Sequence, residues 1–307
     1  MSTRAWILLA LNALTWGSSF LFIKLVVAGT TPLMLTFGRC ALGAVVMWLY
    51  IWLRQTPAII SGRQGLEYHR SERMGLLIVA LMTGIPFTIF AWAETHITSG
   101  LAGIANASTP VWSTLLAMRW DHDHRGSPMR WFGVTLGFAG VAILLVAEGA
   151  TGSAADTLAL ASLTVAAFCY SIGGITTRVR LRQIDSARVA AWSSTIPAFI
   201  FAVPAIYSLH GHLPPTNALL ALLALGVVPT GIGLLLYYKL LEMVGASRAA
   251  MVTYVMPPLA VAYGAIFLSE SVTIIMVASM IVILLGVFIG SREWGGPVEI
   301  EGVTPAS

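Results

Sequence analysis

Ten long apolar runs constrain this chain more than any other feature of its sequence. Each is long enough to cross the hydrocarbon core of a membrane as an α-helix, which takes about 20 residues. Runs of this length are too long for the strands of a membrane barrel, and they lack the alternation of such strands. We therefore expect an all-α membrane protein with ten transmembrane helices, over residues 5–27, 32–53, 74–94, 98–118, 129–147, 157–177, 187–208, 217–238, 247–268 and 272–291.

The composition leaves no room for a large water-exposed domain. Of the 307 residues, 57% are hydrophobic and 10% are charged, whereas about 25% are charged in soluble domains. A net charge of +4 over such a chain does not indicate binding to nucleic acid. The expected partners are membrane lipid and a small-molecule substrate. Cys40 and Cys169 lie inside apolar runs, where unpaired thiols are expected.

The positions of the basic residues predict the orientation in the membrane. Fifteen of the 17 Lys and Arg residues fall at one set of helix ends, beginning with Arg4, and the opposite connections contain none. Cytoplasmic connections carry the excess of Lys and Arg. Both termini are therefore expected in the cytoplasm of a cell whose inner (plasma) membrane the chain spans. The tail 293–307, rich in Glu, Gly and Pro, is expected to be a disordered cytoplasmic end.

The two halves of the chain resemble each other. Glu94, Ser99 and Pro110 recur at a separation of 148 residues, as Glu242, Ser247 and Pro258. Five helices per half is an odd number, so the second copy must enter the membrane from the opposite side. We expect one repeat over residues 1–150 and an inverted repeat over 151–292. Inverted repeats are a common plan of secondary transporters, with the substrate site near the middle of the membrane.

Helix-breaking residues occur at corresponding places in both halves, which is a further indication of a central site. Proline removes a backbone hydrogen bond and kinks a helix, so each such residue is either a hinge for gating or a tolerated bend. The candidate hinges are Pro86, Pro110, Pro229 and Pro257.

Several motifs in order resemble one known family. They are Trp16-Gly-Ser-Ser-Phe20 with Lys24, Pro32 leading to Arg39, Ser99 to Pro110, Gly133 to Gly140, and Gly245-Ala-Ser247 through Pro257 to Ser269-Glu270. Together they resemble the EamA-type transporters of the drug/metabolite transporter superfamily, and within it the amino-acid exporters of the YddG type. The resemblance implies a ten-helix inverted-repeat fold that carries small organic solutes. The first half has no counterpart of Glu270, for which a structural role at the start of the tenth helix is expected.

Polar side chains inside a bilayer are costly and should face the protein interior. A mostly apolar pocket with a few such groups suits a small amphipathic ligand. The substrate-binding residues expected at this depth are Trp16, Ser19, Arg39, Thr83, Phe87, Asn106, Tyr170, Thr230, Tyr237 and Tyr254. Each Ser or Thr could instead bond its own helix, and Arg39 could be an anchor rather than a ligand for a substrate carboxylate.

The expected function is export of small neutral or zwitterionic metabolites by alternating access, with amino acids, including aromatic or hydrophobic ones, as the first candidates. Other organic solutes or drugs, or channel-like facilitation, are the alternatives. No Asp or Glu lies at the middle of a run, which leaves passive flux and proton exchange through Glu94 both open. Few central cations argue against phosphorylated substrates.

Enzyme, cofactor and metal motifs are missing from the sequence. All six histidines lie in or beside connections, so no serine–histidine pair is expected within the membrane. Asp121-His-Asp-His124 is expected to be a solvated loop rather than a metal site. Glycines spaced for close helix packing occur in 129–147 and 272–291; they are expected to join these helices within a monomer or, alternatively, to form a homodimer.

Overall fold

The computed structural model describes residues 2–54, 68–120, 128–249 and 251–291. Within these ranges every regular element is helical and none is a strand. The expected tail 293–307 and the Asp121–His124 loop lie outside the described residues. The elements are α1 (Thr3–Val27), α2 (Pro32–Leu53), α3 (Arg70–Ala93), α4 (Ser99–Asn106), α5 (Thr109–Trp120), α6 (Pro128–Thr151), α7 (Ala154–Arg180), α8 (Ser186–Ser208), α9 (Thr216–Leu225), the π-helical segment η3 (Gly226–Ile232), α10 (Gly233–Ala249), α11 (Val252–Leu268) and α12 (Ile274–Ser291).

These elements group into ten helical segments, as the sequence predicts, and seven of them are long and apolar enough to cross a membrane. Seven candidate spans are α1, α2, α3, α6, α7, α8 and the continuous stretch from Thr216 to Leu240. The shorter apolar helices α11 and α12 add two, and α4 with α5 forms the broken fourth span. The outward-facing side chains are apolar, including Phe199, Val146 and Ile266, which are 79%, 72% and 71% exposed. Such a surface is suited to lipid.

Most boundaries differ from the prediction by a few residues, and the largest difference lies at the end of α10. The sequence places a connection between residues 238 and 247, whereas α10 continues as a helix to Ala249. Hydropathy falls there because Lys239, Glu242 and Arg248 are charged. A helix can nevertheless extend beyond the apolar zone, since charge limits insertion into lipid and not helix formation.

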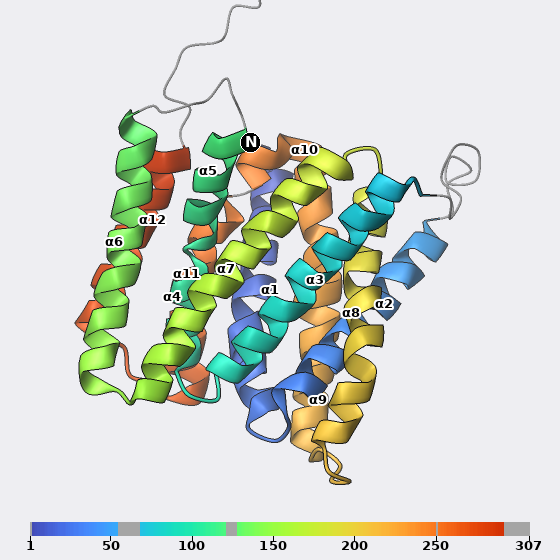
Figure 1. Ribbon diagram of the computed structural model, residues 1–307, viewed down its shortest axis with the longest axis horizontal. Helices are drawn as coiled ribbons and strands as arrows, with labels where there is room; N and C mark the ends of the chain where they lie inside the picture. The colour runs from blue at the N-terminus through green and yellow to red at the C-terminus, as the bar shows by residue number, and fades with distance from the viewer. Residues whose placement is uncertain (1, 55–67, 121–127, 250, 292–307) are drawn as a thin grey trace, which may run out of the picture.

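Two pairs of corresponding helices, α2 with α8 and α6 with α12, pack against each other in antiparallel directions. In the α2–α8 pair, Thr31 bonds Ser208 at one end and Trp48 bonds Thr195 toward the other. As residue numbers rise along α2, the numbers of the residues that they contact on α8 fall, so the two helices are antiparallel. In Figure 1, α1 runs downward from the N-terminus whereas α7 runs upward, and α12 ends at the same end of the bundle at which α1 begins. This is the geometry that an inverted repeat requires.

A glycine seam joins α6 to α12, and the two helices lie side by side at the left of Figure 1. Gly133 lies against Gly286 and Gly290, and a Cβ atom added at Gly133 would come within 2.7 Å of the Gly286 carbonyl oxygen. Gly140 lies against Ile283 in the same way. The expected close packing of these helices is therefore found within one chain, where only glycine allows the backbones to approach so closely.

Candidate functional site

Arg39 lies at the centre of a polar cluster inside the bundle. Its side chain, on α2, is only 8% exposed. The Nε atom donates to the hydroxyl of Thr230 at 2.9 Å, and Nη2 donates to the hydroxyl of Ser19 at 2.9 Å. α1, α2 and η3 thus meet at one guanidinium. Three residues expected at the site from the sequence are in direct contact here.

Aromatic rings form one wall of this cluster. The Phe87 ring on α3 lies under the guanidinium of Arg39, 3.8 Å from its central carbon. Tyr170 on α7 packs edge-on against Phe87 at 6.3 Å between centroids, and it stacks on Phe90 at 6.1 Å. A cation over an aromatic face is attracted by the ring quadrupole, more strongly when both are away from water.

The position of Thr230 depends on the interruption of the eighth span. Pro229 has no backbone N–H, so the carbonyl oxygen of Leu225, four residues earlier, lacks its usual helical donor. The Thr230 hydroxyl donates to that oxygen at 2.9 Å. The same hydroxyl accepts the bond from Arg39. The π-helical segment therefore aims Thr230 at the centre of the bundle.

A second aromatic pair includes a residue of α1 that lies one turn before Ser19. The rings of Trp16 and Tyr237 are 4.9 Å apart between centroids. The backbone of α10 approaches Trp16 closely, since a Cβ atom at Gly233 would lie 2.7 Å from the indole. Because Trp16 precedes Ser19 by about one helical turn, this pair borders the Arg39 cluster.

The structure does not join the other three expected residues to Arg39. The Thr83 hydroxyl donates to the Val79 carbonyl oxygen of its own helix at 2.8 Å. Asn106 is the last residue of α4 and is partly exposed; its amide has no hydrogen bond with any described residue. Tyr254, on α11, packs against the largest hydrophobic cluster.

The four candidate hinge prolines fall into two groups. Pro110 lies at the start of α5, directly after the break that separates α4 from α5, and Pro229 lies within η3. Pro86 and Pro257 lie inside α3 and α11, which continue through them. Only the first two prolines therefore coincide with a departure from regular α-helix, which is a break at Pro110 and a π-helical segment at Pro229.

Ser171, which the sequence did not single out as a site residue, fastens the break between α4 and α5 to α7. Its hydroxyl lies 2.9 Å from the Thr109 carbonyl oxygen and from that of Ala167, and it accepts from Ser113 at 3.0 Å. Its neighbour Tyr170 contributes to the aromatic wall. Of these two consecutive residues of α7, Ser171 holds the break between α4 and α5, and Tyr170 belongs to the aromatic wall. In the sequence, the only sign of this role was a polar Tyr-Ser pair within an apolar run.

Charged groups close the end of the bundle opposite the N-terminus. Lys24 Nζ donates to the carbonyl oxygens of Glu94 and Ile97 at 2.6 and 2.7 Å. Glu270 accepts from Ser99 N at 2.8 Å, from Ser99 Oγ at 2.9 Å and from Gly100 N at 3.1 Å. Glu270 therefore caps α4.

The expectation that Glu270 caps the tenth helix is wrong. The start of α12 is instead capped by Thr273, whose hydroxyl accepts a hydrogen bond from Met276 N at 3.1 Å. Glu270 precedes α12 by four residues, and the chain between them directs its carboxylate to the other half of the protein. A carboxylate at a helix N-terminus is stabilised by the unpaired N–H groups there, and in this fold α4 presents them.

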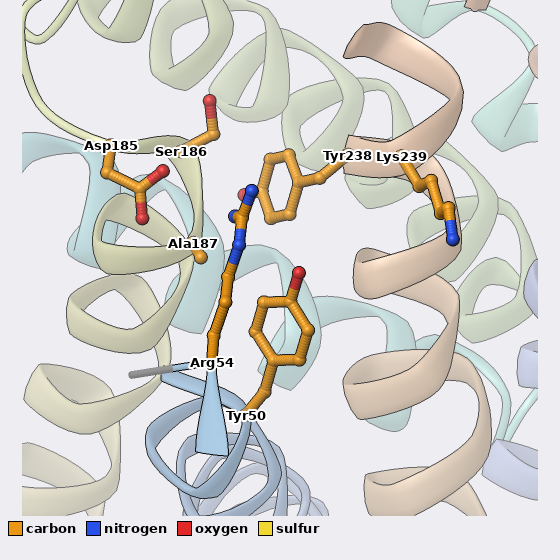
Figure 2. Close-up of a pocket in the computed structure, with 7 residues that line it drawn as sticks. All are labelled: Tyr50, Arg54, Asp185, Ser186, Ala187, Tyr238 and Lys239. Carbon is orange, nitrogen blue, oxygen red and sulfur yellow. The ribbon is translucent and has the colours of Figure 1, made fainter. Parts of the chain in front are cut away.

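Two cavities lie away from Arg39, toward the end of the bundle that carries the N-terminus. One of about 240 Å³ is lined by Tyr50, Arg54, Asp185, Ser186, Ala187, Tyr238 and Lys239. In Figure 2 the Arg54 side chain stands among these residues, with the rings of Tyr50 and Tyr238 beside it. Another of about 250 Å³ lies between α3 and α8, at Tyr68 and Trp192. The side chain of Arg39 itself is buried.

The charge of Arg39 is not paired directly with a carboxylate of any described residue. Arg39 forms no ion pair within 4.0 Å with any residue that the structure describes, and its direct partners are two neutral hydroxyls and a ring. Over the same residues, no group of His, Cys, Asp and Glu is arranged to hold a metal ion. A guanidinium without an ion-pair partner has the chemistry to accept an anion, for example a carboxylate.

Comparisons with known proteins agree with this architecture. The model of the EamA-like transporter family matches residues 3–146 and 157–292. The chain is 22% identical to "Uncharacterized transporter YoaV" of Bacillus subtilis, over 91% of this chain and 93% of that one. It is 24% identical to "Probable terminal-alkyne amino-acid exporter" of Streptantibioticus cattleyicolor, over 88% and 87%.

A solved crystal structure has the same fold, with a TM-score of 0.66 and 17% identity over 94% of this chain and 96% of the other. The apolar helices and the transporter relatives identify a multi-pass integral protein of the inner membrane. Because the family model covers nearly the whole sequence, this chain belongs to the EamA-like transporter family.

Proposed function

We propose that this transporter is a secondary carrier that exports small neutral or zwitterionic metabolites, with amino acids, including aromatic or hydrophobic ones, as its substrates. The observation that carries the proposal is the buried guanidinium of Arg39, which has no carboxylate partner among the described residues. A buried charge without an opposite charge is costly. A substrate carboxylate would remove that cost.

The neighbours of Arg39 suit the rest of such a solute. A carboxylate can accept two parallel bonds from a guanidinium, and it would replace the hydroxyls of Ser19 and Thr230 in doing so. Phe87 and Tyr170 offer aromatic surface next to the cation. The Trp16–Tyr237 pair offers more surface one turn away. An apolar or aromatic amino-acid side chain would pack on these rings.

The closed and open ends support alternating access. Lys24 and Glu270 fasten the end that we assign to the outside, whereas the cavities lie at the end with the N-terminus, which we assign to the cytoplasm. In this scheme the halves 1–150 and 151–292 rock about the central cluster. The interrupted helices at Pro110 and Pro229 are the proposed hinges.

Two alternatives share this geometry. The carrier could take other small organic solutes or drugs, or act as a channel-like facilitator. The exporter named in Streptantibioticus cattleyicolor favours amino acids. A counterflow experiment distinguishes a carrier from a channel. Only a carrier takes up labelled solute faster when unlabelled solute is present on the opposite side of the membrane.

The test uses purified protein in liposomes, with labelled amino acids, their carboxamide analogues, sugars and drugs. Arg39→Gln should raise the half-saturation concentration for amino acids by about 10- to 100-fold, the equivalent of a charged hydrogen bond of about 1.5–3 kcal/mol. Carboxamides should bind weakly to both proteins. Arg4→Gln is the control, since Arg4 is an exposed cation at the start of α1. Unchanged half-saturation in Arg39→Gln would refute the proposal.

A further inference from the structure

The carboxyl group of Glu94 is buried without a partner. Glu94 follows directly on α3, at the closed end of the bundle, and its side chain is 0% exposed. Both carboxyl oxygens are without a hydrogen bond from any described residue. Its backbone carbonyl, in contrast, is held by Lys24 Nζ at 2.6 Å. The sequence showed Glu94 at a helix end, where contact with water would be the ordinary state.

The charged groups that face Glu94 are committed to other partners. Lys24, from α1, directs its ammonium group to two backbone carbonyls. Glu270, from the segment before α12, gives both carboxylate oxygens to the start of α4. Arg39, from α2, is bonded to Ser19 and Thr230. Among the described residues these three charged groups lie close enough to influence Glu94, and none of them forms a hydrogen bond with its carboxyl group.

The remaining titratable groups at this end do not reach the carboxyl group either. The carboxylate of Asp156, at the start of α7, accepts from Ser153 N at 2.8 Å. His96 is exposed and packs against Trp92, with ring centroids 5.0 Å apart. At the facing end of α4, Ser99 has both its N–H and its hydroxyl bonded to Glu270.

Burial without a partner decides the protonation state of Glu94 in this closed arrangement. An isolated carboxylate away from water loses its hydration, and the group takes up a proton instead. The nearby positive charge of Lys24 and negative charge of Glu270 act in opposite senses. If α1, α3 and α4 separated at this end, water would reach Glu94, and a hydrated glutamate ionises at neutral pH.

We propose that Glu94 is a proton-binding site at the outer end of the transporter, which must be protonated for that end to close. The proposal rests on the transport function given above, because it assigns the closed end to the outside. Each closure takes one proton from the outer solution onto the carboxylate, and each opening returns it. Raising the outer pH therefore holds the outer end open and slows the transport cycle.

The first test does not depend on a substrate. Infrared spectroscopy of the detergent-solubilised protein should show the carbonyl band of a protonated carboxylic acid at neutral pH, and this band should be lost in Glu94→Gln. Asp156→Asn is the control, because it removes a carboxylate from the same end of the bundle whose ionised form is stabilised by Ser153. A wild-type spectrum without the band, or a band that persists in Glu94→Gln, would overturn the proposal.

The second test measures exchange of a labelled amino acid in liposomes while the outer pH is varied. Wild-type exchange should fall as the pH rises, by up to about tenfold per pH unit once Glu94 titrates. Glu94→Gln, which resembles the protonated form, should exchange at a rate that does not depend on pH, and Asp156→Asn should behave as the wild type. The same pH profile in Glu94→Gln and wild type would contradict the proposal. If no solute exchanges in any protein while the infrared band behaves as expected, the transport function fails and the proton site stands.

Discussion

Replacing Thr230 by valine isolates the bond that holds Arg39 in the closed protein. Valine has the shape of threonine but no hydroxyl, so Arg39 Nε loses an acceptor at 2.9 Å and the Leu225 carbonyl loses a donor at 2.9 Å. Thr83→Val is the matched control. Among the described residues the Thr83 hydroxyl bonds only the Val79 carbonyl of its own helix, at 2.8 Å. The difference between the two variants reports the contact with Arg39.

The size of that difference follows from the charge on the donor. A hydrogen bond to a charged group contributes about 1.5–3 kcal/mol, so Thr230→Val should be less stable than Thr83→Val by about this amount. At about 2 °C per kcal/mol for a chain of this size, the unfolding temperatures should differ by about 3–6 °C. Tryptophan fluorescence of the detergent-solubilised proteins during heating measures this.

A double-mutant cycle completes the experiment. In an Arg39→Met background the partner is missing, so Thr230→Val and Thr83→Val should lower the unfolding temperature equally. Equal losses already in the presence of Arg39 would mean that the hydroxyl of Thr230 does not hold the guanidinium. A difference that survives in Arg39→Met would trace the effect to the π-helical segment itself and would refute the reasoning.

Two further predictions concern the glycine seam and the end of α4. Gly133→Ala should destabilise the protein by about 1–3 kcal/mol through overpacking, because its new Cβ would meet the Gly290 Cα at 2.7 Å. Gly290→Ala is the control: the nearest heavy atoms to its new Cβ lie at 3.7 Å, so the thermal stability should be unchanged or raised by up to about 1 kcal/mol. Equal losses of stability in both variants would show that the seam is not closely packed. Asn106→Ala should slow transport while keeping the unfolding temperature, since its amide has no hydrogen bond with any described residue; a wild-type rate would remove Asn106 from the site.

The spans could be predicted because lipid imposes a length and a composition on every crossing helix. The same constraint makes a polar residue in an apolar run conspicuous, which is how Arg39, Ser19 and Thr230 were selected before any contact was known. Their binding role stays a prediction, although the structure places them together. Hydropathy could not give the end of α10, because it reports on lipid contact rather than on helix formation.

The hydrogen-bond partners that side chains find on distant helices could not be predicted from the sequence. Lys24 reaches carbonyl oxygens about 70 residues away, and Glu270 reaches Ser99 across 171 positions. Such contacts depend on which helix ends meet after packing, and backbone carbonyls and N–H groups leave no mark in the sequence. The sequence could name Glu94 as a candidate for proton exchange, but only the packing around it shows that its carboxyl group is buried.

The glycine seam also has a consequence for how the chain is made. α6 ends at Thr151 and its partner α12 begins at Ile274, so about 120 residues must be synthesised between them. At about 5–20 residues per second, α6 waits for about 6–25 seconds in the bilayer before its partner exists. During that interval the small-residue face of α6 has no helical partner at the seam, and the synthesis of α12 is needed before the packing of the first half is complete.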